Sequence, residues 1–110
     1  MATGSAALDR IVTRLGETSD PRRRYEYVLS LARKLPPLPE EFRQDVFKVR
    51  GCVSQVHVVG QLVDGGLHWQ GDSDALITKG LLALLIEGLE GLSPEAVVAL
   101  DPAFIAATGL

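Results

Sequence analysis

Residues 46–70, VFKVRGCVSQVHVVGQLVDGGLHWQ, contain the change of hydrophobic period that decides the fold. Apolar and polar residues alternate over residues 46–50, and a second extended run covers Val53 to Val59. Alternation with a period of two is typical of strands, because successive side chains point to opposite faces of a sheet. Both runs are therefore predicted strands, with Gly51 and Cys52 at the bend between them.

A hairpin is predicted directly after these strands. Residues 63–66, Val-Asp-Gly-Gly, favour a tight turn because Asp-Gly and Gly-Gly pairs accept the positive φ angles that such turns require. The next strand is predicted over Leu67 to Gln70. The segment thus predicts a small antiparallel sheet of three strands.

Helical patterns flank the predicted sheet. Before it, Ser5 is expected to cap one helix that ends near Gly16, and Asp20 followed by Pro21 to start a second helix that ends near Leu35. Helices and strands lie in separate runs, which indicates an α+β domain with helices from both ends of the chain packed on the sheet.

A long helix is predicted after the sheet, from about Ala75 to Leu89, with the Gly-Asp-Ser-Asp run of residues 71–74 as its cap. Its apolar residues cover most of its circumference, so it is expected to be the most buried element, with Leu81 and Leu85 in the core. Two short helices are predicted to follow, one from Ser93-Pro94 and one from Asp101-Pro102.

Length and composition narrow the classes of function. The 110 residues suffice for one domain, and a net charge of −3 argues against a general surface for nucleic acids. The Arg22-Arg23-Arg24 run is interpreted as a solvated helix face. Neither a secretion signal nor a membrane span is recognisable, so the protein is expected to be cytoplasmic.

Cys52 is the only cysteine of the chain. A single thiol cannot form an internal disulfide or supply the Cys pairs of a structural zinc or iron–sulfur site. Its place on a connection beside Gly51, with Lys48 and Arg50 nearby to favour the thiolate, suggests reactivity. A small buried side chain without chemistry is the alternative, and the residues alone leave both open.

Other polar residues carry weaker hypotheses. His57 or His68 could serve as a base for Cys52, as in a cysteine hydrolase, but no third orienting group is evident. Asp64, Asp72 and Asp74 could suggest a cation site, yet turns and caps explain Asp at all three positions. No metal site is therefore expected.

Several stretches together resemble the SufE family of sulfur acceptors. They include LARKLPPLP (residues 31–39), VRGCVSQV (49–56) and LHWQGDSDALITK (67–79), and the resemblance covers about residues 21 to 110. Cys52 is followed by Val53 where the family often has Gln, and His57 stands where an aromatic residue is usual. The family usually continues through a further C-terminal segment, so the chain is expected to be a single SufE-like domain, residues 1–110, without that segment.

The resemblance implies a sulfur-transfer function. Cys52 would take the persulfide sulfur of a pyridoxal-phosphate-dependent cysteine desulfurase and deliver it to an iron–sulfur scaffold complex, with no cofactor of its own. Such a protein stimulates the desulfurase and has no separate activity. The residues implied in partner binding surround the cysteine or form the acidic pair: Gly51, Ser54, Gln55, Asp72 and Asp74.

A protein of a different class remains as the second hypothesis. A regulatory adaptor could bind a desulfurase, or a related enzyme of sulfur trafficking, without using its thiol. A cluster scaffold fits poorly, because scaffolds typically need several thiolates and this chain has one.

Overall fold

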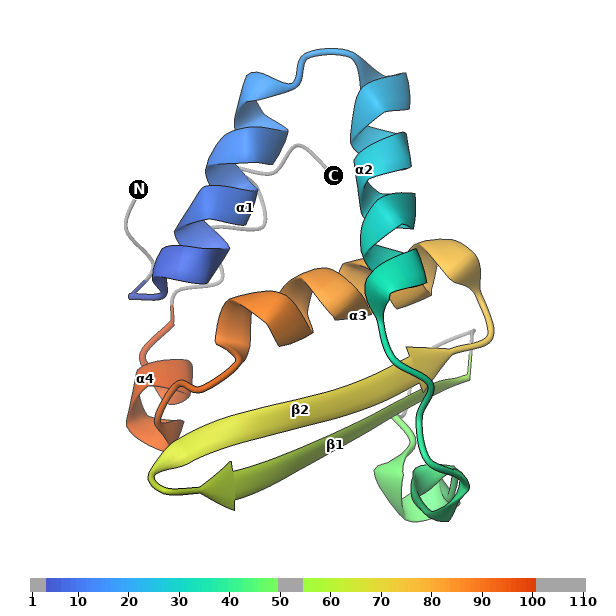
Figure 1. The fold of residues 1–110 in the computed structure, drawn as a ribbon, viewed down its shortest axis with the longest axis vertical. Helices are drawn as coiled ribbons and strands as arrows, with labels where there is room; N and C mark the ends of the chain where they lie inside the picture. The colour runs from blue at the N-terminus through green and yellow to red at the C-terminus, as the bar shows by residue number, and fades with distance from the viewer. Residues whose placement is uncertain (1–3, 50–54, 101–110) are drawn as a thin grey trace.

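The computed structural model describes residues 4–49 and 55–100 and shows an α+β fold with four helices and a two-stranded antiparallel sheet. The helices α1 and α2 form an open hairpin over one side of α3, and the strands β1 and β2 lie along its other side (Figure 1). The bounds in chain order are α1 Ala6–Glu17, α2 Pro21–Lys34, β1 Val56–Val63, β2 Gly66–Ser73, α3 Leu76–Leu89 and α4 Pro94–Val98.

The predicted hairpin is confirmed and is longer than expected. Asp64 and Gly65 both adopt positive φ, 50° and 81°, in the turn between β1 and β2. The strands pair over eight residues each, so Gly71, Asp72 and Ser73 belong to β2 and do not form a helix cap. The N-cap of α3 is Ala75, without a side-chain hydrogen bond. The cap prediction for residues 71–74 was therefore wrong.

A further strand was predicted over residues 46–50, and the structure has no strand over the described part of that run, residues 46–49. Asp45–Phe47 forms a 3-10 turn, in which the N–H groups of Phe47 and Lys48 donate to the carbonyls of Gln44 and Asp45. These local bonds use donors that a strand would give to its neighbour. Only Lys48 makes a bridge to β1, opposite His57, while a first 3-10 turn covers Glu40–Phe42.

The expected caps of the first two helices are confirmed. The Ser5 hydroxyl accepts from Leu8 N–H at 3.1 Å, and the Asp20 carboxylate accepts from Arg22 N–H at 3.0 Å. Ser5 is buried and its hydroxyl also donates to the carbonyl of Gly88 at 2.5 Å. One side chain thus starts α1 and joins it to the end of α3.

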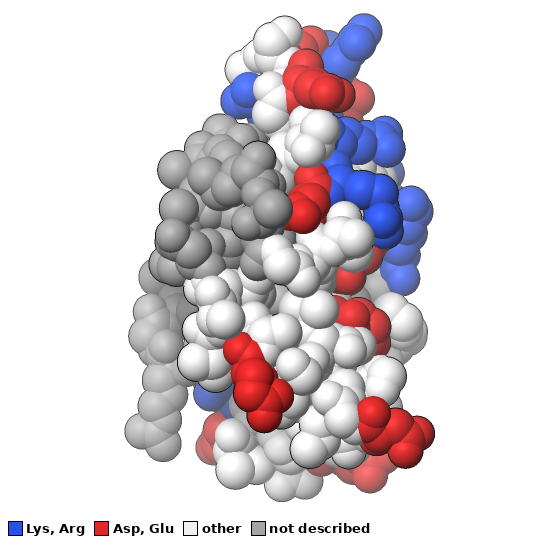
Figure 2. Space-filling view, turned by 90° about the vertical axis from the view of Figure 1, so that its left-hand side faces the viewer, with Lys and Arg blue, Asp and Glu red and all other residues white. Residues whose placement is uncertain are grey.

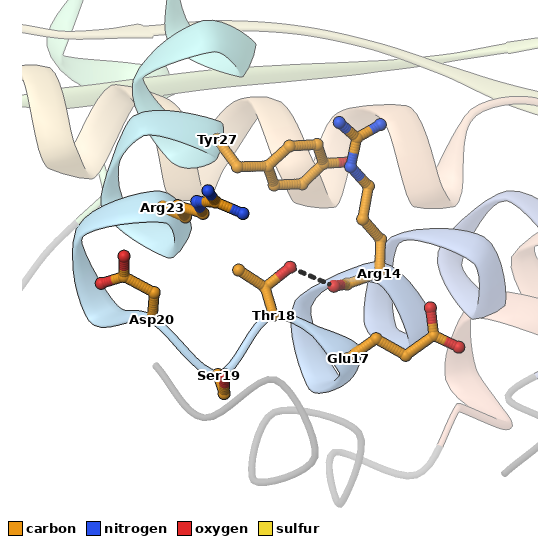
Figure 3. A pocket seen from close by; sticks show the side chains of 7 residues that line it. All are labelled: Arg14, Glu17, Thr18, Ser19, Asp20, Arg23 and Tyr27. Atoms are coloured by element: carbon orange, nitrogen blue, oxygen red, sulfur yellow. Dashed lines mark hydrogen bonds between the residues drawn. The ribbon is translucent and has the colours of Figure 1, made fainter.

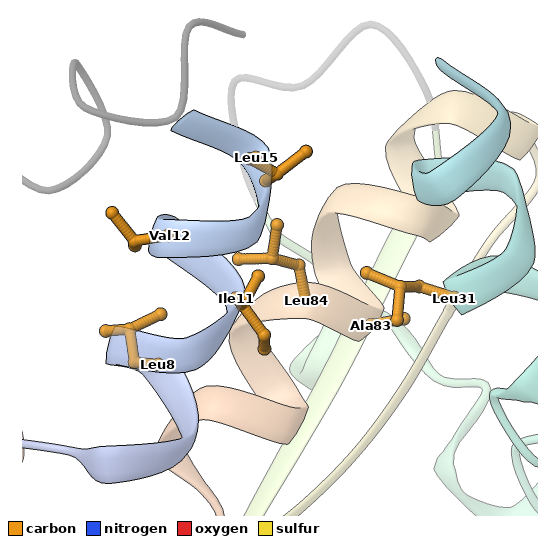
Figure 4. Packing of buried hydrophobic residues seen from close by; sticks show 7 residues of the cluster. All are labelled: Leu8, Ile11, Val12, Leu15, Leu31, Ala83 and Leu84. Atoms are coloured by element: carbon orange, nitrogen blue, oxygen red, sulfur yellow. The ribbon is translucent and has the colours of Figure 1, made fainter. Parts of the chain in front are cut away.

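The core lies where α1 and α2 cross α3 (Figure 4). Its buried cluster comprises Leu8, Ile11, Val12, Leu15, Leu31, Ala83 and Leu84. The expected burial of Leu81 and Leu85 was wrong, because these side chains are 39% and 37% exposed. The largest fully buried side chains, Leu8 and Leu15, belong to α1, so α3 contributes small residues and one leucine to a core that α1 fills.

Two glycines allow the helices to approach α3 closely. A Cβ atom at Gly80 would lie 2.5 Å from the backbone oxygen of Val28, and one at Gly88 would lie 2.7 Å from Leu8 Cδ1. Ordinary carbon contacts are about 3.5–4.0 Å. The side chain of Leu8 can shift, but the α2 backbone at Val28 cannot move without displacing the helix.

Gly80→Ala is therefore expected to lower the free energy of unfolding by about 1–3 kcal/mol, the usual range for overpacking. Chemical denaturation followed by circular dichroism measures this change. Gly16→Ala is the control, because Gly16 is an exposed helical residue where alanine normally gains about 0.5–1 kcal/mol. A neutral or stabilising Gly80→Ala would contradict the close crossing of α2 and α3.

The fourth helix begins as predicted, with the Ser93 hydroxyl accepting from Ala96 N–H. The short helix predicted from Asp101-Pro102 lies outside the described residues. In the part of the chain that the structure describes, no helix is long and apolar enough to cross a membrane.

Candidate functional site

The predicted site is divided between described and undescribed residues. Gly51, Cys52 and Ser54 belong to residues 50–54, which lie outside the described residues, as does the predicted bend. Gln55, Asp72 and Asp74 are described and lie close together. The structure therefore defines the frame that holds both ends of the cysteine segment, residues 50–54.

The two ends of the cysteine segment meet through backbone contacts. Val49 N–H donates to the carbonyl of Val56 at 2.7 Å, and Lys48 is bridged to His57 on the same strand. The residue before the segment is thus hydrogen-bonded to the first residue of β1, which begins one residue after the segment ends.

Asp74 holds the far end of the cysteine segment. Its carboxylate accepts from Gln55 N–H at 2.9 Å, and its own N–H donates to the Gln55 carbonyl at 3.2 Å. The side chain of one residue and the backbone of both therefore join the start of β1 to the turn between β2 and α3. Two predicted partner-binding residues thus make contacts with each other in the isolated chain.

Asp72 is the centre of a charged cluster. Its Oδ2 accepts from Arg43 Nη2 at 2.6 Å, and its Oδ1 lies 3.3 Å from Lys79 Nζ. Oδ1 also accepts from the N–H of Ser73 at 2.8 Å. The side chain of Asp72 is only 14% exposed, so both oxygens are committed to partners inside the protein. Asp72 lies in β2 and therefore does not cap α3.

The electrostatics of Asp72 favour its ionised form. Burial by itself would raise the pKa, but hydrogen bonds from Arg43, Ser73 N–H and Lys79 outweigh it, and the pKa lies below its ordinary value of 3.8. A carboxyl group whose pKa is lowered by folding stabilises the folded state above its unfolded pKa, and this contribution is lost as the pH falls through the folded pKa. Asp72 is therefore ionised at neutral pH, and its contribution to stability is lost as the pH falls below its ordinary pKa of 3.8.

A small hollow of about 110 Å³ lies among these residues. It is lined by residues of the connection between α2 and β1, of β1, of β2 and of the turn that follows β2: Arg43, Gln55, His57, Asp72, Ser73 and Asp74. The lining is polar and charged, which suits the docking of a polar partner segment better than the enclosure of a small apolar ligand. It is the candidate functional site of the described part of the chain.

The two histidines differ in their surroundings. His57 lines the hollow and pairs in register with Asp72 across the sheet. His68 lies farther along β2, with Nδ1 at 3.4 Å from the carboxylate of Glu90, and both side chains are about half exposed. That carboxylate also accepts from the N–H of Trp69, which ties the strand to the end of α3. His68 therefore pairs with Glu90 and does not line the hollow.

Sequence reasoning missed Arg43 and Lys79. Arg43 is 29 positions from Asp72 and follows a Pro-rich run, and no spacing rule connects the two residues. Lys79 lies in the first turn of α3 and ends the LHWQGDSDALITK stretch, but no pattern in the sequence pairs it with Asp72. Only the packing of the α2–β1 connection and of α3 against β2 brings these two cations to one carboxylate.

A larger cavity of about 360 Å³ lies in the turn between α1 and α2 (Figure 3). The Arg14 guanidinium stacks on the Tyr27 ring at 4.5 Å from its centroid, and Glu17, Asp20 and Arg23 lie around the rim. Burial raises the pKa of Tyr27, and the nearby Arg14 only partly opposes this. None of the predicted site residues lines this cavity, and its balanced charges select no single class of ligand.

The charges are unevenly distributed over the surface. Most Lys and Arg residues belong to α1 and α2, and Figure 2 shows them gathered in the half of the molecule that these helices form. Arg22 is 86% exposed and pairs with Glu26 at 3.4 Å, as expected for a solvated helix face. Over residues 4–49 and 55–100, no group of three or more His, Cys, Asp or Glu side chains could hold a metal ion.

Comparisons with known proteins point to one family. The family model "Fe-S metabolism associated domain", SufE, matches residues 9–110. A SufE-like protein of Synechocystis is 50% identical over 109 residues, which are 99% of this chain and 69% of that protein. The cysteine desulfuration protein SufE of Plasmodium vivax is 41% identical over 96 residues, 84% of this chain and 38% of that protein.

Two more matches extend the comparison. The chloroplastic or mitochondrial SufE-like protein 1 of Arabidopsis thaliana is 35% identical, over 94% of this chain and 28% of its own length. The chain thus spans less than two thirds of two of these three relatives. A solution structure of a hypothetical protein from Thermus thermophilus superposes with a TM-score of 0.81 at 28% identity, covering 96% of this chain and 77% of the other.

Proposed function

The chain belongs to the SufE family of Fe-S metabolism associated domains, and from this premise we propose that it is a sulfur acceptor with Cys52 as the accepting residue. Its sulfur donor is a pyridoxal-phosphate-dependent cysteine desulfurase, and the receiver is an iron–sulfur scaffold complex. The observation that carries the proposal is the family match across residues 9–110, within which Cys52 is the only thiol.

The transfer requires only a thiolate and access to it. The Cys52 thiolate attacks the outer sulfur of the desulfurase persulfide, so a new S–S bond forms on Cys52 and the S–S bond on the desulfurase breaks. The proton stays on the transferred sulfur, and the desulfurase cysteine leaves as a thiolate. The exchange has no net oxidation or reduction, and it needs neither a histidine base nor a cofactor.

The described frame supports an acceptor role. Val49 and Gln55 are held by hydrogen bonds to Val56 and Asp74, so both residues that flank the cysteine segment are anchored, and Gln55 also lines the polar hollow. Gly51, Ser54 and Gln55 belong to or adjoin this segment, and we assign them to the surface that meets the desulfurase. Asp74 contributes to that surface indirectly, through its hold on Gln55.

The test is intact-protein mass spectrometry after incubation with a cysteine desulfurase and cysteine. The expected result is a gain in mass of one sulfur atom that a reductant reverses, because a persulfide is cleaved by thiols. Cys52→Ser, which keeps a polar side chain of similar size, is expected to gain nothing. Absence of the added sulfur in the native protein would contradict the acceptor role.

A further inference from the structure

Three segments that are distant in sequence converge on Asp72. Arg43 belongs to the connection between α2 and β1, Asp72 to β2, and Lys79 to the first turn of α3. We call these three residues the Asp72 clamp. Because Asp72 is 14% exposed, its two ion pairs are better shielded from solvent than an ordinary surface pair.

The clamp acts on the connection that leads into the cysteine segment. Within the described residues, that connection meets the hairpin through the Arg43–Asp72 pair, the Lys48–His57 bridge and the Val49–Val56 hydrogen bond. His57 and Asp72 face each other in the sheet register. The ion pair and the backbone contacts therefore hold the connection against the same end of the hairpin.

We propose that Arg43, Asp72 and Lys79 are positioning residues for sulfur acceptance, because they hold the connection that leads to Val49, the last described residue before the cysteine segment, against the hairpin. The inference rests on the proposed function of Cys52. The clamp residues are not reacting groups; they act by fixing Val49 relative to Gln55, the two described residues that flank the cysteine segment. Small misplacements of a reacting group can lower a rate strongly.

The charges around Asp72 support this assignment. Arg43 also faces Glu40 at 3.6 Å in its own turn, Lys79 approaches from α3, and Asp74 and His57 line the same hollow. Removal of Arg43 would leave the partly buried carboxylate with one cation, and removal of the Asp72 charge would leave two cations side by side. Either change releases the connection without removing a residue of the helical core.

The variants are Arg43→Ala, Asp72→Asn and their double, with Arg43→Lys as the conservative substitution. Arg22→Ala is the matched control, because it removes an exposed Arg–Glu pair on α2 that includes no residue of the clamp. Native-state hydrogen exchange, measured without any partner, follows the amides of Val49 and Gln55, and those of Ile11 and Leu15 report on the core. Sulfur uptake from a desulfurase is measured over a range of concentrations of this protein. The fit gives the maximal rate and the protein concentration at which the rate is half-maximal.

Arg43→Ala and Asp72→Asn are expected to lose protection at Val49 and Gln55 while the α1 amides keep theirs. The maximal rate of sulfur uptake is expected to fall roughly tenfold, with a smaller change in the half-saturating concentration. The double variant should be no worse than either single one, because both break the same pair. Arg43→Lys keeps the charge and should recover part of the rate.

Three results would overturn the clamp proposal. They are unchanged uptake in the single variants, lower uptake without loss of protection at Val49 and Gln55, and a fall in protection that extends equally to α1. A native protein that takes up no sulfur would overturn the proposed function instead, and the two failures are therefore distinguishable.

Discussion

Replacement of Cys52 by alanine is expected to abolish the stimulation of a cysteine desulfurase while leaving the binding of the two proteins intact. A persulfide left on the desulfurase blocks its next cycle, and a chain without a thiol cannot remove it. Binding should persist because contacts spread over an interface supply the affinity, whereas the thiol supplies only the reaction. Cys52 is the only cysteine, so no second thiol can substitute.

The measurement is sulfide release by the desulfurase with native protein, with Cys52→Ala and with no addition, together with calorimetric titration of each pair. Asp74→Arg is an informative companion, because it removes the carboxylate that holds Gln55 N–H and should change affinity more than the reactivity of the free thiol. Equal stimulation by native and Cys52→Ala protein would exclude the acceptor role. The chain would then be a regulatory adaptor that works without its thiol.

Leu84→Ala is expected to lower the free energy of unfolding by about 2–5 kcal/mol, the range for removing a buried leucine. Leu84 is 4% exposed and packs with Ile11, Leu15 and Ala83 in the cluster between α1 and α3. The gap left by truncation is bounded by two helices that Ser5 and Gly88 join, so it cannot close freely. Denaturant unfolding measures the loss of free energy of unfolding, provided that the slope of this free energy against denaturant concentration is unchanged.

Leu85→Ala is the matched control for this prediction. It makes the same chemical change at the next position of the same helix, but the side chain is 37% exposed and lies outside the buried cluster. Its cost should be clearly smaller, because part of its apolar surface already contacts water. Equal losses at the two positions would show that the exposed side of α3 is as well packed as the core side.

The helix boundaries were largely predictable because their signals are local. Ser5, Asp20-Pro21 and Ser93-Pro94 each satisfy helix N–H groups within a few residues, and no distant contact is needed to make them caps. The Asp64-Gly65 turn is local in the same way. Residues 46–49 have an equally clear alternation of apolar and polar residues. Their N–H groups at positions 47 and 48 nevertheless bond within a 3-10 turn, which the alternation does not reveal.

The candidate site was predictable only in part. The Gly-Cys-x-Ser-Gln and Gly-Asp-Ser-Asp stretches were recognised by resemblance, and Gln55 and Asp74 do lie in contact. The role of Asp72 differed from a helix cap because β2 continues through it. No pattern in the sequence marked Arg43 as part of the site. A single arginine after a Pro-rich run can point in any direction, and arginines are usually exposed.

The sequence by itself therefore determined the class of the fold, most element boundaries, the family and the identity of the only thiol, because these depend on neighbouring residues or on matching motifs. Tertiary structure alone decided which face of α3 is buried, since its apolar residues surround the helix and only Gly80 and Gly88 permit close crossing by α2 and α1. It also decided that Arg43 and Lys79 share Asp72. Such pairings depend on how distant segments pack, and no local period encodes them.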